Sequence, residues 1–331
     1  MSSVAQAKAP SRPPTAKRGS QKDVERRSAI WLIIPTIAIL AVVIGYPIVT
    51  AVIESFQKDP GLDPTTGMFS QGGFAGFSNY THFLAQQCGT VTCPPGTNGA
   101  AFWTSVGNTF LFTVCTVVLE TVLGVWMAII MNRSFRGRAL VRASVLVPWA
   151  IPTAVTAKLM LFMFATYGIV NVVLQQQILW LSDPTAARIA IIVSDVWKTT
   201  PFMALLILAG LQIIPDEIYE AARVDGASTV QQFFRITIPL IKPALMVAVL
   251  FRTLDALRMY DLPAILTGGG PGISTTTLSM LVVSQIRQGF NAAAALSTLT
   301  FIIIFLVAFV FVRFLGANVV ATQSGTKKGE A

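Results

Sequence analysis

The feature that most constrains this chain is a series of six apolar segments, each long enough to cross a membrane as a helix. A helix rises 1.5 Å per residue, so about 20 residues cross the hydrocarbon core of a bilayer. The segments cover residues 29–56, 101–131, 143–166, 189–214, 243–266 and 292–312. The chain is 53% hydrophobic and only 12% charged, against roughly 25% charged in soluble domains. The sequence therefore predicts an all-α membrane protein with six transmembrane helices.

The apolar segments also divide the chain into regions. Residues 1–28 are rich in Pro, Ser, Ala, Lys and Arg, which predicts a disordered, basic cytoplasmic tail. The first helix, at 29–56, has an apolar run about twice as long as a signal-peptide core, so we expect it to be retained. An extracellular loop is predicted at residues 57–100 and a five-helix core at 101–316. Within that core a coupling loop is predicted at 215–238, and a C-terminal cytoplasmic tail follows at 317–331.

The positions of the basic residues predict the orientation of the helices. Membrane proteins carry an excess of Lys and Arg on their cytoplasmic side. With the N-terminus inside, seventeen Lys and Arg residues lie on that side, and only Lys58, Arg188 and Arg287 lie outside. Both termini are therefore expected in the cytoplasm. The net charge of +9 reflects this bias rather than a nucleic-acid partner. The basic tail has two interpretations: an ordinary positive-inside tail, which the charge bias favours, or a segment that attracts anionic membrane lipid.

The few histidine and cysteine residues predict neither a metal site nor a histidine-based catalytic triad. His82 is the one histidine, and the sequence contains no C-x-x-C pair. Cys88 and Cys93 lie in the predicted outer loop, where an oxidising environment would allow a disulfide. The alternative is a pair of free thiols. Cys115 lies in an apolar segment and is expected to be buried.

Charged residues inside the apolar segments indicate a polar path through the membrane. Each costs about 2.5–3.5 kcal/mol at the centre of an inserted helix, so it is expected to face protein or water. Segment 243–266 carries a charge at every third position, near one helical face: Arg252, Asp255, Arg258 and Asp261. Segment 189–214 carries Asp195 and Lys198. The balance of signs favours a neutral polar solute such as a sugar, because an ion path would show one sign.

These charges have two interpretations. Paired donors and acceptors, together with an aromatic wall formed by Trp197, Phe202 and Tyr260, would bind sugar hydroxyls and a ring face. Alternatively, the charges form ion pairs that lock the helices together or to a partner chain. Glu120 and Lys158 are solitary on their segments, and we expect them to pair across helices rather than touch a substrate.

The loop between the fourth and fifth segments carries the strongest local signal. Pro215 is suited to the first turn of a helix, and the acidic residues after it lie near the positive end of the helix dipole. Gly226 is suited to end that helix in the left-handed conformation. A second amphipathic run, 228–238, continues to Pro239. The pattern predicts two short helices joined by a sharp turn, which would fit a groove on a cytoplasmic partner.

The same loop resembles the EAA loop of ABC importer permeases, with the pattern E-A-A-x-x-D-G-A-x(5)-F-x-x-I-x-x-P-x-x-x-P. All ten fixed positions match: Glu220, Ala221, Ala222, Asp225, Gly226, Ala227, Phe233, Ile236, Pro239 and Pro243. The run Leu266–Pro271 resembles the L-T-x-G-G-P turn of the maltose-type carbohydrate permeases. Within that family the chain most resembles the trehalose importer permeases of mycobacteria.

The resemblance implies a multi-pass protein of the bacterial inner membrane that imports a sugar, such as the disaccharide trehalose, by alternating access. In this family the EAA loop docks on the ATPase, which assigns coupling to Glu220, Ala221, Ala222, Asp225, Gly226 and Ala227. The implied partners are an ATPase dimer, a second homologous permease and an extracellular substrate-binding lipoprotein. The sequence lacks a Walker A motif, so we expect no catalytic site and no cofactor bound directly; the ATPase holds ATP and Mg²⁺.

The resemblance also implies where the sugar binds. Counting back from Glu220 without gaps places Asp195, Lys198, Thr199 and Phe202 at the family's sugar-site positions. Counting back from the glycine-rich turn gives Arg252, Ala256 and Met259. The last two are apolar where maltose permeases have small polar residues. The predicted substrate-binding set is therefore Asp195, Lys198, Thr199, Phe202, Arg252, Asp255 and Arg258.

Other functions stay open at this point. An importer for glycerol phosphate, a polyamine or a peptide would share the loop, although a phosphate ester would require an excess of cations. A membrane glycosyltransferase would use the Asp and Arg residues as catalytic groups, and a proton-coupled carrier would need no cytoplasmic docking helix. The EAA pattern favours the ABC permease over both of these.

Overall fold

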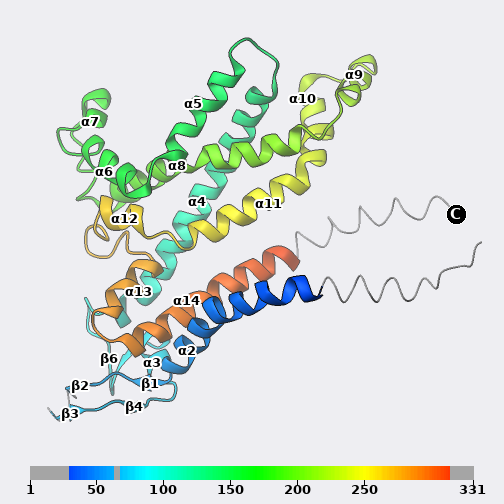
Figure 1. Cartoon of the computed structure of the whole chain (residues 1–331). Coiled ribbons are helices and arrows are strands. Elements are labelled where there is room, and N and C mark those ends of the chain that lie inside the picture. Colours follow the sequence, from blue (N-terminus) through cyan, green and yellow to red (C-terminus); the bar gives the residue numbers. More distant parts are fainter. Residues whose placement is uncertain (1–29, 63–67, 314–331) are drawn as a thin grey trace, which may run out of the picture. The chain divides into compact units, whose positions relative to one another are not determined.

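The computed structural model describes residues 30–62 and 68–313, which are mostly helical (Figure 1). The tails expected at 1–28 and 317–331 lie outside the described residues. The chain divides into two compact units between Ile53 and Glu54. Within the described residues, five helices are long and apolar enough to cross a membrane, and one bent pair of helices makes a sixth span if counted together.

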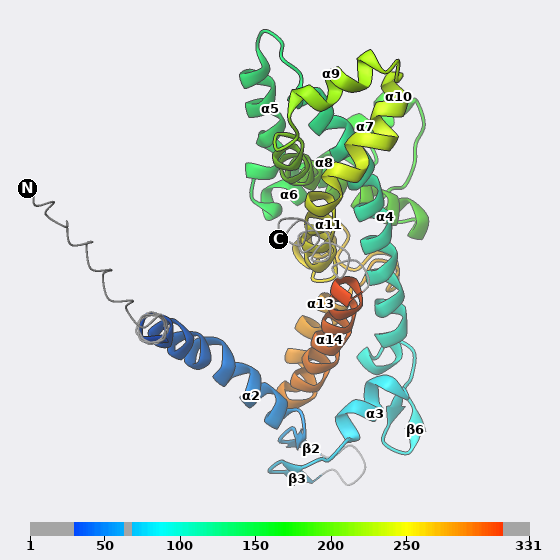
Figure 2. The same cartoon turned by 90° about the vertical axis from the view of Figure 1, so that its right-hand side faces the viewer.

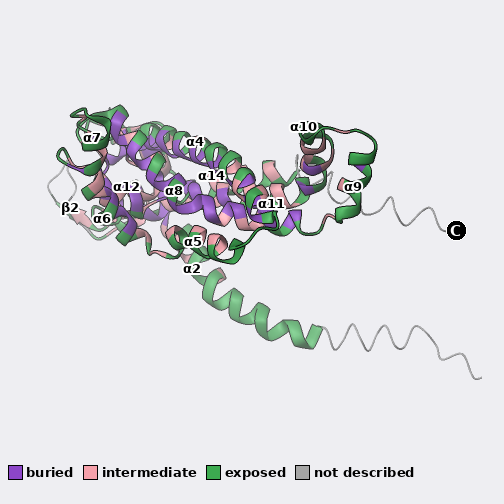
Figure 3. Ribbon diagram, turned by 90° about the horizontal axis from the view of Figure 1, so that it is seen from above, coloured by how far each residue is buried: buried purple, intermediate pink, exposed green. Residues whose placement is uncertain are grey.

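The first span, Ile30–Glu54, contains the π-helical turn η1 (Ala41–Gly45) followed by α2 (Tyr46–Glu54). None of its described residues is buried in this unit (Figure 3). Its apolar side chains point in all directions, and the Thr50 hydroxyl donates within the helix to the Tyr46 carbonyl, at 3.0 Å. A helix that is apolar around its whole circumference is typical of one surrounded by lipid or by other membrane helices.

Four further spans lie in the second unit: α4 (Asn98–Asn132), α8 (Pro184–Leu211), a continuous helix at Thr229–Ala256 and α14 (Phe290–Phe311). The start of α8 shows why a span begins where it does. The Asp183 carboxylate accepts hydrogen bonds from the Thr185 and Ala186 amides, at 2.9 and 2.8 Å, and Pro184 occupies the first turn. A capping carboxylate and an initial proline both favour helix initiation.

The segment predicted as one span at 143–166 is broken. It forms α5 (Arg138–Ala150) and α6 (Thr153–Met163), which meet at 90°. Ile151 is extended, with ψ 131°, and precedes Pro152. Proline disfavours the helical conformation in the residue before it and lacks the N–H that would continue the helix. The predicted span is therefore two helices rather than one continuous helix, and it counts as a sixth span only as a bent pair.

The fifth predicted span, 243–266, is also different in the structure. The helix begins much earlier, as α10 (Thr229–Gln232), and passes through the π-helical η2 (Phe233–Thr237) into α11 (Ile238–Ala256). It ends at Ala256, and a separate short helix, α12 (Asp261–Leu266), follows. The separate second helix expected at 228–238 is thus part of a span. The π turn, in which the Ile238 amide bonds to the Phe233 carbonyl, carries the chain past Pro239 without a break.

The core of the second unit lies where α4, α8 and α11 pack together. Ala128 and Met131 of α4, Met203 and Ile207 of α8 and Ile241 of α11 are buried in one cluster. Buried residues concentrate on α8, which these helices surround (Figure 3). Close approach depends on small residues, because a Cβ added at Gly210 would lie 2.4 Å from the Ala244 Cβ.

The loop after the first span contains short strands, although the sequence predicted an all-α fold. Three antiparallel pairs, β1 (Gln57–Lys58) with β4 (Gly73–Phe74), β2 (Gly61–Leu62) with β3 (Phe69–Ser70) and β5 (Gln87–Cys88) with β6 (Val91–Thr92), flank α3 (Ser78–Leu84). The Asp59 carboxylate accepts hydrogen bonds from the Asn291 and Ala292 amides, at 2.7 and 2.9 Å. This loop therefore caps the first turn of α14.

The glycine-rich turn Leu266–Pro271 connects α12 to α13 (Leu278–Ile286). Gly268, Gly269 and Gly270 all have positive φ, between 63° and 100°. Side chains with a Cβ rarely adopt this conformation, which explains the run of glycines. Asn108 of α4 holds the segment that follows by donating to the Ile273 and Thr276 carbonyls, at 2.9 and 3.0 Å.

We predict that Gly210→Ala destabilises the protein although alanine is the better helix former. The added methyl would meet the Ala244 Cβ at 2.4 Å and push α8 and α11 apart, and overpacking of this kind costs about 1–3 kcal/mol. The matched control is Gly107→Ala in α4, where an added Cβ meets nothing within 4 Å. Thermal unfolding in detergent should show a lower midpoint for Gly210→Ala alone; equal midpoints for both variants would contradict the close packing.

Candidate substrate site and coupling loop

The centre of the second unit holds a cluster of four charged side chains from three helices. Arg252 of α11 is only 2% exposed and contacts Glu120 of α4, Asp195 of α8 and Asp255 on its own helix. Its Nη2 donates to a Glu120 oxygen at 3.0 Å, and its Nη1 donates to Asp255 Oδ2 at 2.9 Å. Further hydrogen bonds join Nε to Glu120 and Nη2 to Asp195. One planar guanidinium with five donors thus connects all three helices.

Glu120 has a second partner, because its carboxylate lies within hydrogen-bonding distance of the Thr199 hydroxyl on α8. The prediction that Glu120 pairs across helices is confirmed. For Lys158 the structure shows an exposed side chain, and it forms no ion pair within the described residues.

Lys198 lies beside the cluster but bonds differently. Its Nζ donates to the Ile151 carbonyl at 2.7 Å, at the break between α5 and α6. It forms no ion pair among the described residues, so two of its three N–H donors have no partner in these parts of the chain. The three carboxylates and two cations of this region together leave one negative charge.

A cavity of about 270 Å³ adjoins these charges. It is lined from several elements by Trp149, Thr153, Asp195, Lys198, Thr199, Arg252, Asp255, Met259, Tyr260, Asp261 and Leu262. The wall combines carboxylate acceptors, cationic donors, hydroxyls and two aromatic rings. Such a mixture suits a polar molecule with many hydroxyl groups and one apolar face.

Five of the seven residues predicted to bind substrate line this cavity: Asp195, Lys198, Thr199, Arg252 and Asp255. Phe202 lies elsewhere, with its ring stacked on Trp149 at 5.9 Å between centroids. Arg258 is exposed and does not line the cavity. The three-residue spacing that grouped Arg258 with Arg252 assumed a continuing helix, and α11 ends at Ala256.

Trp149 and Thr153, which flank the break, were not predicted from the sequence, and Met259 was left out of the predicted set because it is apolar. Trp149 lies within an apolar segment, so its presence there did not indicate a binding site. A segment taken as one continuous helix gives no reason to place Trp149 or Thr153 at a cavity. Pro152 was the available signal, because an internal proline breaks or kinks a helix.

The coupling loop forms an exposed helix, α9 (Asp216–Val224), after Pro215 at its N-cap. The helix ends at Gly226, with φ +77°. The Ala227 amide bonds to the Ala222 carbonyl at 2.9 Å and the Gly226 amide to the Arg223 carbonyl at 3.1 Å, which is the Schellman arrangement. Ser228 then caps α10 through a capping box with Gln231.

The surface of α9 presents most of the motif. Glu220, Ala221, Asp225 and Gly226 are exposed, whereas Ala222 is buried. Glu220 has one ion-pair partner in the described residues, Arg223 at 4.0 Å, and both side chains are about two-thirds exposed. An exposed pair at this distance contributes little. Within the second unit, α9 and α10 lie at the end opposite to the strands of the outer loop (Figure 2).

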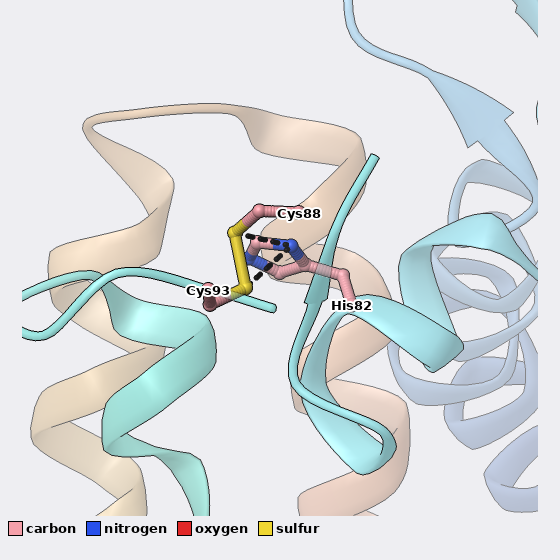
Figure 4. Close-up of side chains that lie close together, drawn as sticks. All are labelled: His82, Cys88 and Cys93. Carbon is pink, nitrogen blue, oxygen red and sulfur yellow. Dashed lines mark hydrogen bonds between the residues drawn. A yellow bond between two sulfur atoms is a disulfide. The ribbon is translucent and has the colours of Figure 1, made fainter. Parts of the chain in front are cut away.

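The outer loop brings His82, Cys88 and Cys93 within 4.8 Å of one another, which is the spacing of a metal site. Cys88 and Cys93 are joined by a disulfide, however, so neither offers a thiolate (Figure 4). Burial lowers the pKa of His82, against a smaller opposing effect of its hydrogen bond to the Gln87 carbonyl. The ring packs against the disulfide, with Nδ1 at 3.7 Å from the Cys88 sulfur and 3.8 Å from the Cys93 sulfur.

A bundle of apolar helices around a polar cavity, with an exposed helix between two spans, defines a membrane permease. The chain belongs to the family described as the binding-protein-dependent transport system inner membrane component, which it matches over residues 120–321. It is therefore a multi-pass inner-membrane permease subunit of an ABC importer. Such a subunit is not an enzyme, and ATP is hydrolysed by a separate ATPase subunit.

Relatives support this assignment over most of the chain. The trehalose/maltose transport system permease protein MalF of Thermococcus litoralis is 38% identical over 87% of this chain and 94% of its own length. The sulfoquinovosyl glycerol transport system permease protein SmoG of Agrobacterium fabrum is 39% identical over 82% and 85%. The trehalose transport system permease protein SugA of Mycobacterium tuberculosis is 34% identical over 91% and 92%, which confirms the resemblance to mycobacterial trehalose permeases.

Solved structures support the fold. A chain from a bacterial ABC transporter involved in the import of the acidic polysaccharide alginate aligns with a TM-score of 0.68 and 22% identity. The alignment covers 91% of this chain and 98% of that chain. The chain therefore shares its fold with that transporter chain.

We predict that Arg252→Met strongly destabilises the protein. It leaves Glu120, Asp195 and Asp255 clustered without their shared cation, and breaking a buried pair costs about 3–5 kcal/mol. The readout is the yield of folded protein and its thermal midpoint in detergent. The double variant Arg252→Met with Glu120→Gln should recover part of the loss, because it removes one uncompensated carboxylate. Additive losses would contradict a shared network.

Proposed function

We propose that this permease imports a sugar, such as the disaccharide trehalose, and that the cavity beside Arg252 is the sugar site. The observation that carries the proposal is the composition of the cavity wall: paired donors and acceptors together with Trp149 and Tyr260. Sugar hydroxyls need both partners, and a ring face is apolar enough to lie on an aromatic side chain. The relatives named for trehalose, maltose and sulfoquinovosyl glycerol transport support the same substrate class.

A polyamine is the second candidate, because the charges around the cavity sum to one negative. Two features weigh against it. Arg252 engages two of the three carboxylates that line the cavity, Asp195 and Asp255, and Lys198 adds a cation that would repel an amine. Glycerol phosphate is less favoured still, since a phosphate ester calls for a cationic excess that this wall lacks.

The proposed mechanism is alternating access driven through the coupling loop. An extracellular binding lipoprotein delivers the sugar, and an ATPase dimer grips α9 from the cytoplasm, through Glu220, Ala221, Asp225 and their neighbours. A second homologous permease completes the pathway, and both termini lie in the cytoplasm. The opposite placement of α9 and the disulfide-containing loop within the second unit supports this orientation (Figure 2).

A substrate panel tests the proposed function. The assembled transporter, with its ATPase and binding protein, is reconstituted in vesicles, and ATP hydrolysis is measured with trehalose, maltose, glycerol 3-phosphate and spermidine. We expect stimulation by one or more of the sugars. Stimulation by spermidine or by glycerol 3-phosphate without a response to any sugar would contradict the proposal.

The coupling role predicts that Glu220→Lys abolishes uptake while folding and membrane insertion persist. The side chain is exposed and its pair with Arg223 is weak, so stability should change little. Glu217→Lys is the matched control, because it makes the same charge change on the same helix outside the motif. Uptake retained by Glu220→Lys, or lost equally in both variants, would contradict a specific contact at Glu220.

A further inference from the structure

The break between α5 and α6 determines what Trp149 can contact. Trp149 is the penultimate residue of α5, and the chain turns by 90° directly after that helix. The side chain is 48% exposed and lines the cavity beside Lys198 and Arg252. A large aromatic ring at a polar cavity, rather than in the apolar core, needs an explanation.

Lys198 fixes the break from the other side. The Val155 and Thr156 amides both bond to the Pro152 carbonyl, at 3.0 Å. The Ile151 carbonyl instead accepts the bond from Lys198 Nζ, at 2.7 Å. An ammonium at this point satisfies a backbone acceptor that the broken helix exposes, so it holds the bend that presents Trp149.

The ring of Phe202 on α8 stacks against the indole of Trp149. The two rings are 5.9 Å apart between centroids and only 18° from parallel, and Phe202 does not line the cavity itself. An offset-stacked neighbour restricts the indole to one orientation. The cavity therefore has a preformed, flat aromatic wall.

Polar groups border the same space. Two N–H donors of Lys198 have no partner in the described parts of the chain, and the Asp255 side chain is 67% exposed with one oxygen bonded to Arg252. One donor and one acceptor beside a flat apolar surface match a sugar ring, which carries hydroxyls on its edge and C–H groups on its face.

We propose that Trp149 is a specificity-determining residue, whose indole stacks against the ring of the transported sugar while Lys198 and Asp255 bind its hydroxyls. The inference rests on the proposed function and deepens it, since it assigns the recognition of a ring to a residue outside the set that the sequence predicted. Phe202 acts through Trp149 as a positioning residue.

The test measures sugar imported per ATP hydrolysed, with the complete transporter in vesicles and a saturating amount of trehalose-loaded binding protein. Trp149→Leu should lower this ratio about tenfold, since it removes the stacking surface. Trp149→Phe keeps an aromatic face and should stay within about threefold of the unsubstituted transporter. Phe202→Leu should give an intermediate ratio. The matched control is Trp126→Leu, which removes a tryptophan that is 62% exposed on α4, away from the cavity.

Several results would overturn the inference without touching the proposed function. They are sugar import by Trp149→Leu at the unsubstituted ratio, a parallel fall of import and hydrolysis that leaves the ratio unchanged, and no advantage of Trp149→Phe over Trp149→Leu. An equal fall in Trp126→Leu would do the same. If the unsubstituted transporter imports no sugar at all, the proposed function fails and this inference fails with it.

Discussion

The contact of Arg252 with three carboxylates is the constraint on which the second unit depends. Charged groups buried away from water are tolerated only when they are paired. The three helices must therefore pack so that Arg252 contacts both Glu120 and Asp195. That requirement fixes the rotation of α4, α8 and α11 about their axes. The polar faces of the three helices then converge, and the cavity forms beside them. The wall of this cavity is held by the same bonds that hold the helices together.

The continuity of Thr229–Ala256 links this cluster to the coupling loop. The helix begins next to the turn at Gly226 and carries Arg252 near its other end. α8 joins α9 through a short connection and carries Asp195. The spans that supply Asp195, Lys198, Arg252 and Asp255 to the cavity are thus the two on either side of α9. Under the proposed mechanism, a displacement of α9 passes along these two helices directly to the groups that bind substrate.

Much of this architecture could be predicted from the sequence, because hydropathy and length report membrane helices reliably. The motif around Glu220 likewise gave the position of α9 and the turn at Gly226. What hydropathy does not report is where a membrane helix bends or ends. The break at Ile151–Pro152 and the end of α11 at Ala256 leave the apolar composition unchanged, so Trp149 was overlooked and Arg258 was grouped with Arg252.

The three-residue spacing of charges predicted a contact correctly only where α11 continues. Asp255 is one turn from Arg252 and bonds to it, whereas Arg258 lies beyond the helix end. The sequence predicted that Glu120 pairs with a residue on another helix, but it did not identify Arg252 as the partner. Contacts between residues 132 positions apart follow from packing rather than from local pattern.

The Asp59 cap has a consequence for biosynthesis. The donors to its carboxylate are the amides at the start of α14, the first of them 232 positions along the chain, and the Asn98 side chain likewise donates to Gln285 in α13. The Asn98 bond therefore requires α13, and the Asp59 bonds require the start of α14. A chain that stops before α13 and α14 therefore lacks the hydrogen-bond partners of the Asp59 carboxylate and the Asn98 amide.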